Sequence, residues 1–127
     1  MEIKFTTRFV EVWHKRIHDI EFEYNTEPIN ALYCYLRELS YNLEFAKEIL
    51  SQLDSNKLFD IDFSSSYWGV DITITDDKFK IYSLMDENDT ENQTTLTKHE
   101  FRTVIFEWIA FLKNPPNEGY EKLVSMN

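Results

Sequence analysis

Three histidines and one cysteine are the side chains of this chain best suited to metal binding or nucleophilic catalysis. His14 and His18 are four residues apart, a spacing that brings two imidazoles together only on a helix. The residues around them are more typical of a strand and a turn, and no nearby Cys or His completes a ligand set. His99 falls in the first turn of an expected helix, where it is a surface residue. We therefore expect no metal site.

Cys34 is the only cysteine, which excludes an internal disulfide and a cysteine-rich zinc site and indicates a reducing compartment. A lone cysteine within a helix is usually a small apolar residue, and no cation beside it would lower its pKa. Acidic residues number 23, so any chosen pair of carboxylates is uninformative about acid–base catalysis. We expect that the protein is not an enzyme.

Gly69 and Gly119 are the only glycines. Phosphate-binding loops need several glycines so that backbone amides can approach the anion. A P-loop and a dinucleotide-binding fingerprint are therefore excluded, and we expect no cofactor.

Negative charge is concentrated in one part of the chain. Residues 59–96 hold nine acids and two bases, a net charge of −7, whereas residues 1–25, 26–58 and 97–127 carry −1, −2 and 0. Such a field repels nucleic acid and anionic membrane and attracts a cationic partner, more weakly as salt rises. We expect a protein partner, and neither nucleic acid nor membrane.

The acids of this segment alternate with Ile, Val, Trp and Tyr, which favours a recognition surface over a role in solubility alone. The segment that begins at Asp86 lacks the order of ligands that a calcium loop requires. The expected partner-binding residues are Asp60, Asp62, Tyr67, Asp71, Asp76, Asp77, Asp86, Glu87 and Asp89.

The first 24 residues carry two patterns. Apolar residues alternate with polar ones around Phe5 and around Phe22, as in half-buried strands, yet a helical stripe also runs through Val12 and Trp13. We favour two strands that turn near residues 14–16.

Residues 27–53 predict one long helix. Pro28 suits the first turn, and apolar residues recur at intervals of three and four from Ile29 to Leu53. Tyr41 and Phe45 fall almost opposite that stripe, among acids. They are covered by another element or form a contact with a partner or a second copy, so a homodimer is an alternative.

Three strands are expected next, over 59–64, 67–76 and 78–85, and the last two are joined by a tight turn. A second helix begins with the capping-box spacing of Thr97 and Glu100 and ends before Pro115. The remainder is expected to be a tail with a short helix around 120–124.

Together these elements predict one domain over 1–127, with an ordered core over 1–114 and a C-terminal tail over 115–127. The fold class is α+β, an antiparallel sheet of about five strands with two main helices on one face. The N-terminus lacks the apolar run of a signal peptide, and no stretch approaches the length of a membrane span, so we expect a cytoplasmic protein.

Residues 96–112 form a capped helix that ends in a Trp-x-x-Phe-Leu pattern, beside an acidic and aromatic body. In this the chain resembles the immunity proteins of bacterial polymorphic and contact-dependent growth inhibition toxin systems. The resemblance implies a cytosolic bacterial protein that binds and neutralises a cognate toxin domain, such as a basic nuclease. The alternatives are a self-associating structural or regulatory adaptor and a small ligand-binding domain.

Overall fold

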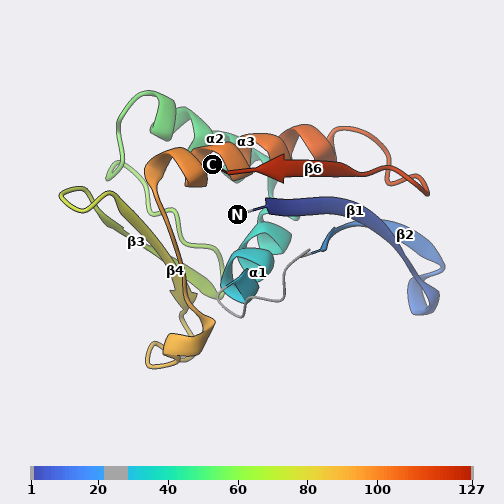
Figure 1. Ribbon diagram of the computed structural model, residues 1–127, viewed down its shortest axis with the longest axis horizontal. Coiled ribbons are helices and arrows are strands. Elements are labelled where there is room, and N and C mark those ends of the chain that lie inside the picture. Colours follow the sequence, from blue (N-terminus) through green and yellow to red (C-terminus); the bar gives the residue numbers. More distant parts are fainter. Residues whose placement is uncertain (1, 22–28, 127) are drawn as a thin grey trace.

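The computed structural model describes residues 2–21 and 29–126, without the side chains of residues 29, 30 and 91. These residues form two antiparallel sheets and three α-helices, joined by turns and irregular segments (Figure 1). The elements in chain order are β1 (Glu2–Val10), the 3₁₀ turn η1 (Glu11–Trp13), β2 (Lys15–Glu21), α1 (Ile29–Leu39), α2 (Leu43–Asp54), β3 (Trp68–Thr73), β4 (Lys78–Ser83), η2 (Thr90–Asn92), β5 (Thr94–Leu96), α3 (Lys98–Leu112) and β6 (Lys122–Ser125).

The first sheet has the order β2-β1-β6, so the two ends of the chain lie side by side in it (Figure 1). The β1–β2 hairpin turns through η1 and His14, whose φ of 48° is left-handed. Phe5 pairs with Ile20 across the hairpin, and both side chains are buried. The predicted pair of strands with a turn near residues 14–16 is confirmed, whereas Phe22 and Tyr24 lie outside the described residues.

The second sheet has the order β3-β4-β5. Its hairpin places Val70 opposite Ile81, both buried, and turns through residues 74–77. The predicted tight turn at Asp76 and Asp77 is confirmed, although the strands are shorter than predicted. Helix α1 packs against this sheet.

Helix α3 links the two sheets. Its first half places the ring of Phe101 4.9 Å from Phe79 of β4, and its second half places Trp108 4.9 Å from Phe5 of β1. The Trp108 indole donates a hydrogen bond to the Leu36 carbonyl of α1 at 2.8 Å. The predicted capping box is present, because the Thr97 side chain accepts from the Glu100 amide and the Glu100 side chain from the Thr97 amide.

The α+β class and the antiparallel pairing are confirmed, but the arrangement differs from one five-stranded sheet with two helices. The long predicted helix over 27–53 is two helices, α1 and α2. Asn42 ends the continuous pattern because its side chain accepts a hydrogen bond from the Phe45 amide at 3.2 Å and caps α2. The new helix starts with its own phase, which is why Ile49 is fully buried outside the predicted stripe.

The strand predicted over 59–64 is wrong, since these residues form turns and irregular backbone. The carbonyl of Phe63 accepts a hydrogen bond from the buried Tyr35 hydroxyl at 2.6 Å. The Asp62 carboxylate accepts one from the Ser64 amide at 2.9 Å. Such side-chain bonds give the backbone an alternative to strand pairing.

The chain after Pro116 contributes to the first sheet. The predicted short helix around 120–124 is wrong, because Lys122–Ser125 form β6 and pair with β1. Val124 is buried, and the ring of Tyr120 stacks on Phe111 with centroids 4.3 Å apart. The segment expected as a tail therefore packs on the core.

Candidate functional site

The β3–β4 hairpin displays several of the predicted partner-binding acids. Asp71 is exposed in the middle of β3 and lies opposite Lys80 of β4. Asp76 and Asp77 are exposed in the turn at its end. Asp77 also has a structural role, since its carboxylate accepts a hydrogen bond from the Lys98 amide at 2.9 Å, at the start of α3. A carboxylate at that position complements the positive end of the helix dipole.

Three predicted residues meet at one hollow. Asp60, Asp62 and Asp71 line a cavity of about 410 Å³ together with apolar residues that include the buried Phe63 and Val70. The irregular segment after α2 brings the first two acids to the side of β3. These three carboxylates come from two separate segments and line the same hollow.

Tyr82 of β4 lies within the field of this acidic group. Burial raises the pKa of its hydroxyl, and the negative charges of Asp71, Glu87 and Asp62 raise it further. Across the hairpin, Tyr82 lies opposite Gly69, and an added Cβ there would be only 2.5 Å from the ring carbon Cζ. The tyrosine ring therefore covers the glycine, and acids from three segments act on its hydroxyl.

The remaining predicted residues lie toward the opposite end of the hairpin from Asp76. The Tyr67 side chain is 57% exposed, and its carbonyl accepts a hydrogen bond from the Leu84 amide at 2.9 Å. Asp86 caps a local turn by accepting from the Asn88 amide, and Asp89 is half-buried. Because a strand rises about 3.3 Å per residue, the two ends of β3 are roughly 17 Å apart. The nine residues are thus spread along the β3–β4 hairpin and the segments that flank it.

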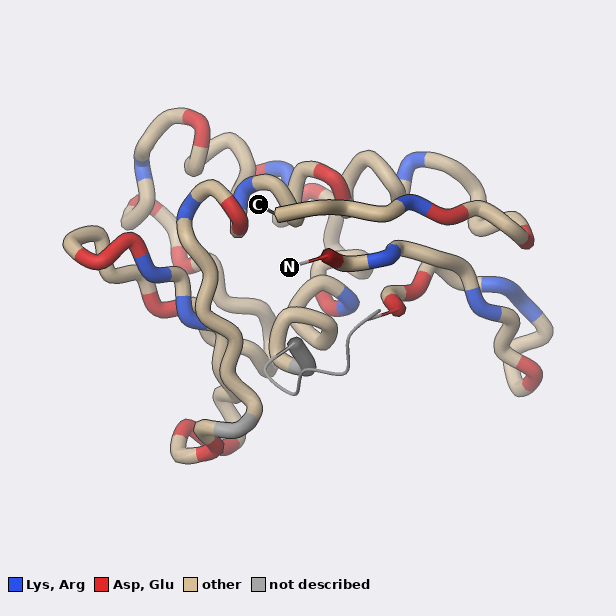
Figure 2. The backbone as a smooth tube through the Cα atoms, viewed as in Figure 1, with Lys and Arg blue, Asp and Glu red and all other residues tan. Residues whose placement is uncertain are grey.

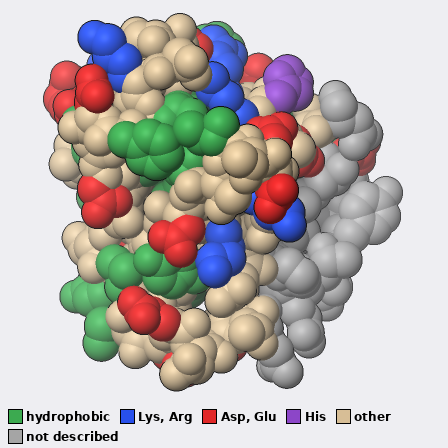
Figure 3. All heavy atoms as spheres, turned by 90° about the vertical axis from the view of Figure 1, so that its left-hand side faces the viewer, with side chains coloured by type: hydrophobic (Ala, Val, Ile, Leu, Met, Phe, Trp, Pro, Cys, Tyr) green, Lys and Arg blue, Asp and Glu red, His purple; other side chains and the backbone are tan. Residues whose placement is uncertain are grey.

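Exposed apolar side chains accompany the acids. Phe59 is 69% and Ile74 62% exposed, and both line a second hollow of about 290 Å³ together with Asp77. Figure 3, which faces this side of the molecule, shows hydrophobic groups between acidic ones. Apolar groups among charges are typical of partner-binding surfaces.

The two residues proposed for self-association also share a hollow. Tyr41 is 77% exposed and lies between α1 and α2, outside the helix on which it was predicted. It lines a cavity of about 560 Å³ with the half-buried Phe45 and Glu38. The Glu38 carboxylate accepts hydrogen bonds from the Ser65 hydroxyl at 2.6 Å and the Tyr67 amide at 3.1 Å.

A buried charge network at Asp19 was not anticipated from the sequence. Its carboxylate accepts hydrogen bonds from Arg8 at 2.6 Å, and from Arg37 and the Tyr33 hydroxyl at 3.0 Å. Burial acts to raise the pKa of Asp19, but these bonds, the Ile20 amide and the charge of Arg37 together lower it. These partners lie 11 to 18 residues from Asp19 along the chain, so no local sequence pattern predicts the network.

The residues suited to catalysis or metal binding are dispersed. His14 lies in the hairpin turn, whereas the His18 ring contacts Phe111, and its Nε2 lies 2.7 Å from the Asn114 carbonyl oxygen. His99 is exposed. Burial and the charge of Glu38 raise the pKa of the Cys34 thiol. Within 2–21 and 29–126, no three His, Cys, Asp or Glu side chains are grouped so that they could hold a metal ion.

Comparison with protein-family models gives no match, and neither the curated proteins nor the solved structures give one. No helix in the described part of the chain is both long and apolar enough to cross a membrane.

Proposed function

We propose that this protein binds a basic protein toxin domain through Asp71 of β3 and the acids of the segments that flank the β3–β4 hairpin, called the acidic band below, and neutralises it, as an immunity protein does. The observation that carries the proposal is that Asp60, Asp62 and Asp71 line one hollow together with apolar residues. These residues belong to the segment with a net charge of −7. The resemblance of residues 96–112 to immunity proteins supports the same function.

The surface suits such a partner for two physical reasons. A nuclease must attract phosphates, so its cleft is basic, and an acidic protein competes for that cleft. Complementary charges accelerate association, while a few buried aromatic or charged anchors supply most of the affinity. Tyr67 and Phe59 are exposed aromatic residues beside the acids and are the expected anchors.

The direct test is to capture the partner from the source organism at low and moderate salt and then to assay its toxic activity. We expect one basic protein that is lost as salt rises and whose activity is abolished when this protein is added back in equimolar amount. A captured partner whose activity is unaffected would refute neutralisation, and a partner that is acidic would refute the role of the acidic band.

The sharper test changes charge within the hollow. Asp60→Asn together with Asp71→Asn removes two charges, whereas Asp62 is kept because it caps the turn at Ser64. Glu48→Gln with Glu118→Gln removes the same charge from exposed positions elsewhere and is the matched control. We expect association with the captured partner in stopped-flow mixing to slow about tenfold at low salt for the first variant and less than about twofold for the control. Equal slowing by both variants would mean that only net charge matters.

A further inference from the structure

A second and chemically opposite cavity lies at the other end of the molecule. Its volume is about 730 Å³, within the range of peptide- and ligand-binding clefts. One wall is formed by Trp13 and residues 15–18 of β2, and the facing wall by Arg37 of α1, Tyr41 and Leu43. This cavity, called the β2 groove below, plays no part in the proposed binding of a basic partner.

The lining shows how the β2 groove meets the sheet. Successive side chains of a strand point to opposite faces. All four consecutive residues 15–18 nevertheless line the groove, so it runs along the edge of β2. Strand β2 is the edge strand in the order β2-β1-β6, and its pairing among the described residues is with β1 alone. An edge strand presents unpaired N–H and C=O groups to an added strand.

The charge of the β2 groove is opposite to that of the whole protein. Lys15, Arg16 and Arg37 line it, and no Asp or Glu is among its described lining residues, although the chain carries a net charge of −10. Arg37 is partly neutralised by Asp19 behind it. Arg16 donates from Nη1 to the Thr7 hydroxyl at 3.1 Å, and no ion pair to it or to Lys15 occurs within residues 2–21 and 29–126.

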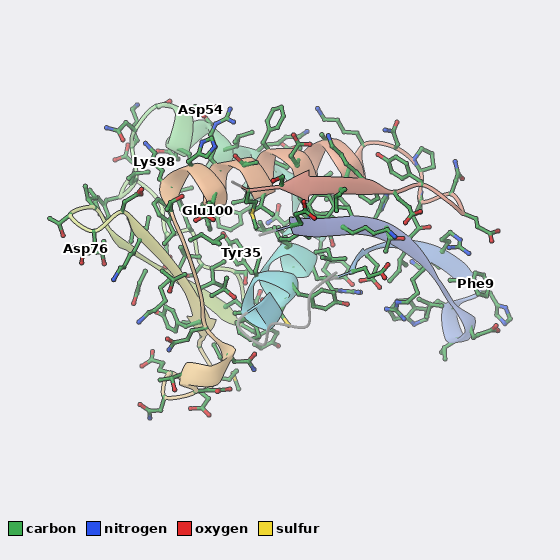
Figure 4. The ribbon with its side chains drawn as sticks, in the orientation of Figure 1. Phe9, Tyr35, Asp54, Asp76, Lys98 and Glu100 are labelled. Carbon is green, nitrogen blue, oxygen red and sulfur yellow. The ribbon has the colours of Figure 1, made fainter. Side chains whose placement is uncertain are left out.

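Apolar groups complete the β2 groove. Ile17, Leu43 and Leu112 supply aliphatic surface, and two aromatic residues stand exposed at it, Trp13 at 54% and Tyr41 at 77%. Exposed aromatic residues next to cations are typical anchors for a partner. Figure 4 shows this end of the molecule, marked by Phe9, far from Asp76 at the other.

We propose that the β2 groove binds an extended segment of a partner protein in which acidic and apolar residues alternate, and that this segment adds to the first sheet as a strand beside β2. Main-chain hydrogen bonds to the edge supply affinity, and alternate side chains supply specificity. The acidic side chains of the segment pair with Lys15 and with Arg37, which itself pairs with Asp19 on the Lys15 face of β2. The apolar side chains alternate with the acidic ones and point to the opposite face of the added strand.

The test uses fluorescence anisotropy of the full chain with three labelled heptapeptides. The first is Glu-Val-Glu-Phe-Glu-Val-Glu, the second replaces each Glu with Lys, and the third is the acidic peptide with N-methylated backbone amides. We expect the first to bind at least about tenfold more tightly than the other two, because only it offers both the charges and the main-chain donors. Equal binding of the N-methylated peptide would overturn strand addition, and equal binding of the lysine peptide would overturn the charge argument.

A pair of variants locates the binding. Lys15→Glu reverses a charge in the β2 groove, whereas Lys57→Glu makes the same change at an exposed lysine outside it. We expect the acidic peptide to bind Lys15→Glu about tenfold more weakly and Lys57→Glu within about twofold of the parent protein. If both variants bind equally, the groove is not the site.

Two further outcomes would also overturn the proposal. In the first, phenylacetate is titrated as a competitor of the labelled acidic peptide. If phenylacetate binds as tightly as the peptide, the groove is a site for small organic anions. Sedimentation of the chain alone over a tenfold concentration range would reveal a dimer, and a dimer abolished by Lys15→Glu would make a second copy the occupant. A monomer that binds the acidic peptide in preference to phenylacetate supports the proposal.

Discussion

The two sheets of this protein share one core but differ in surface charge. The β3-β4-β5 sheet belongs to the segment with nine acids and two bases, whereas residues 1–25, which contain β1 and β2, hold five acids and four bases. In the tube view, acidic positions gather around the β3–β4 turn and before β5, and Lys and Arg mark the β1–β2 hairpin (Figure 2). Both sheets pack on α3, so their difference lies at the surface.

This difference separates stability from recognition. Around the second sheet the acids are mostly exposed, and Asp62, Asp77 and Asp86 accept hydrogen bonds from backbone amides. In the first sheet Asp19 is buried and paired with two arginines. Charge is therefore buried and paired at Asp19 of the first sheet and mostly exposed around the second.

The largest effect is expected where the core joins the two sheets. Phe101 is fully buried against the rings of Phe63 and Phe79, which lie 6.2 and 4.9 Å away. Replacing it with alanine removes these contacts and leaves a cavity, so we expect Phe101→Ala to lower the free energy of unfolding by about 3 to 5 kcal/mol. Chemical denaturation followed by circular dichroism measures the change.

The same experiment tests whether the two sheets unfold together. The exposed Phe106 on the same helix is the matched control, and we expect Phe106→Ala to change the free energy by less than about 1 kcal/mol. A single transition that shifts as a whole shows that α3 couples the sheets. A second transition in Phe101→Ala, with Trp108 fluorescence unchanged in the first, would show that the first sheet persists alone.

The second largest loss of stability is expected at the buried acid Asp19, in contrast to the exposed acids around the second sheet. Asp19→Asn leaves Arg8 and Arg37 without their carboxylate, and we expect a loss of about 2 to 3 kcal/mol at neutral pH. Because the folded pKa of Asp19 lies below its ordinary value of 3.8, the ionised carboxylate stabilises the fold above that pH. The stabilisation disappears as pH falls through the folded pKa.

The pH dependence supplies the control. The difference between the parent protein and Asp19→Asn should be constant near neutral pH and should shrink in acid below about pH 4. Asp76→Asn, which changes an exposed acid in the β3–β4 turn, should alter the free energy of unfolding by less than about 0.5 kcal/mol at neutral and at acidic pH. A difference for Asp19→Asn that persists in strong acid would mean that packing, and not charge, is responsible.

The sequence predicted correctly those elements whose signals lie within a few residues of each other. The capping box at Thr97, the apolar face around Trp108 and the β3–β4 turn depend on residues close in sequence, and the structure contains all three. The break at Asn42 also has a local signal, a capping residue, but it lies within an otherwise unbroken apolar period. Periodicity therefore dominated the prediction, and the two helices were merged.

Long-range contacts could not be predicted in the same way. Strand β6 has four residues and forms only because β1, more than a hundred residues earlier, offers an edge. The alternation at Phe59 to Phe63 is that of a strand, yet no strand among the described residues pairs with it, and the Tyr35 hydroxyl donates a hydrogen bond to the Phe63 carbonyl. The candidate sites differ in the same way. Composition identified the acids around the second sheet, whereas the β2 groove requires residues from three separate segments, 13–18, 37–43 and 112–116.

The smallest effect concerns the outer face of the acidic sheet. Gly69 has no left-handed backbone, so a side chain is excluded there by the close approach of Tyr82 alone. An alanine Cβ would lie 2.5 Å from the ring carbon Cζ and 2.8 Å from the hydroxyl oxygen. We expect Gly69→Ala to displace the ring and to cost about 1 to 2 kcal/mol in chemical denaturation.

A double variant shows whether that ring is the cause. Tyr82→Thr removes the ring and keeps a residue suited to a strand, so Gly69→Ala should cost little in its presence. The two changes should then combine with a favourable coupling energy of about 1 kcal/mol. If they are simply additive, the backbone of β3 and not the tyrosine excludes the side chain. If they couple, the close approach of the tyrosine ring is what excludes the side chain.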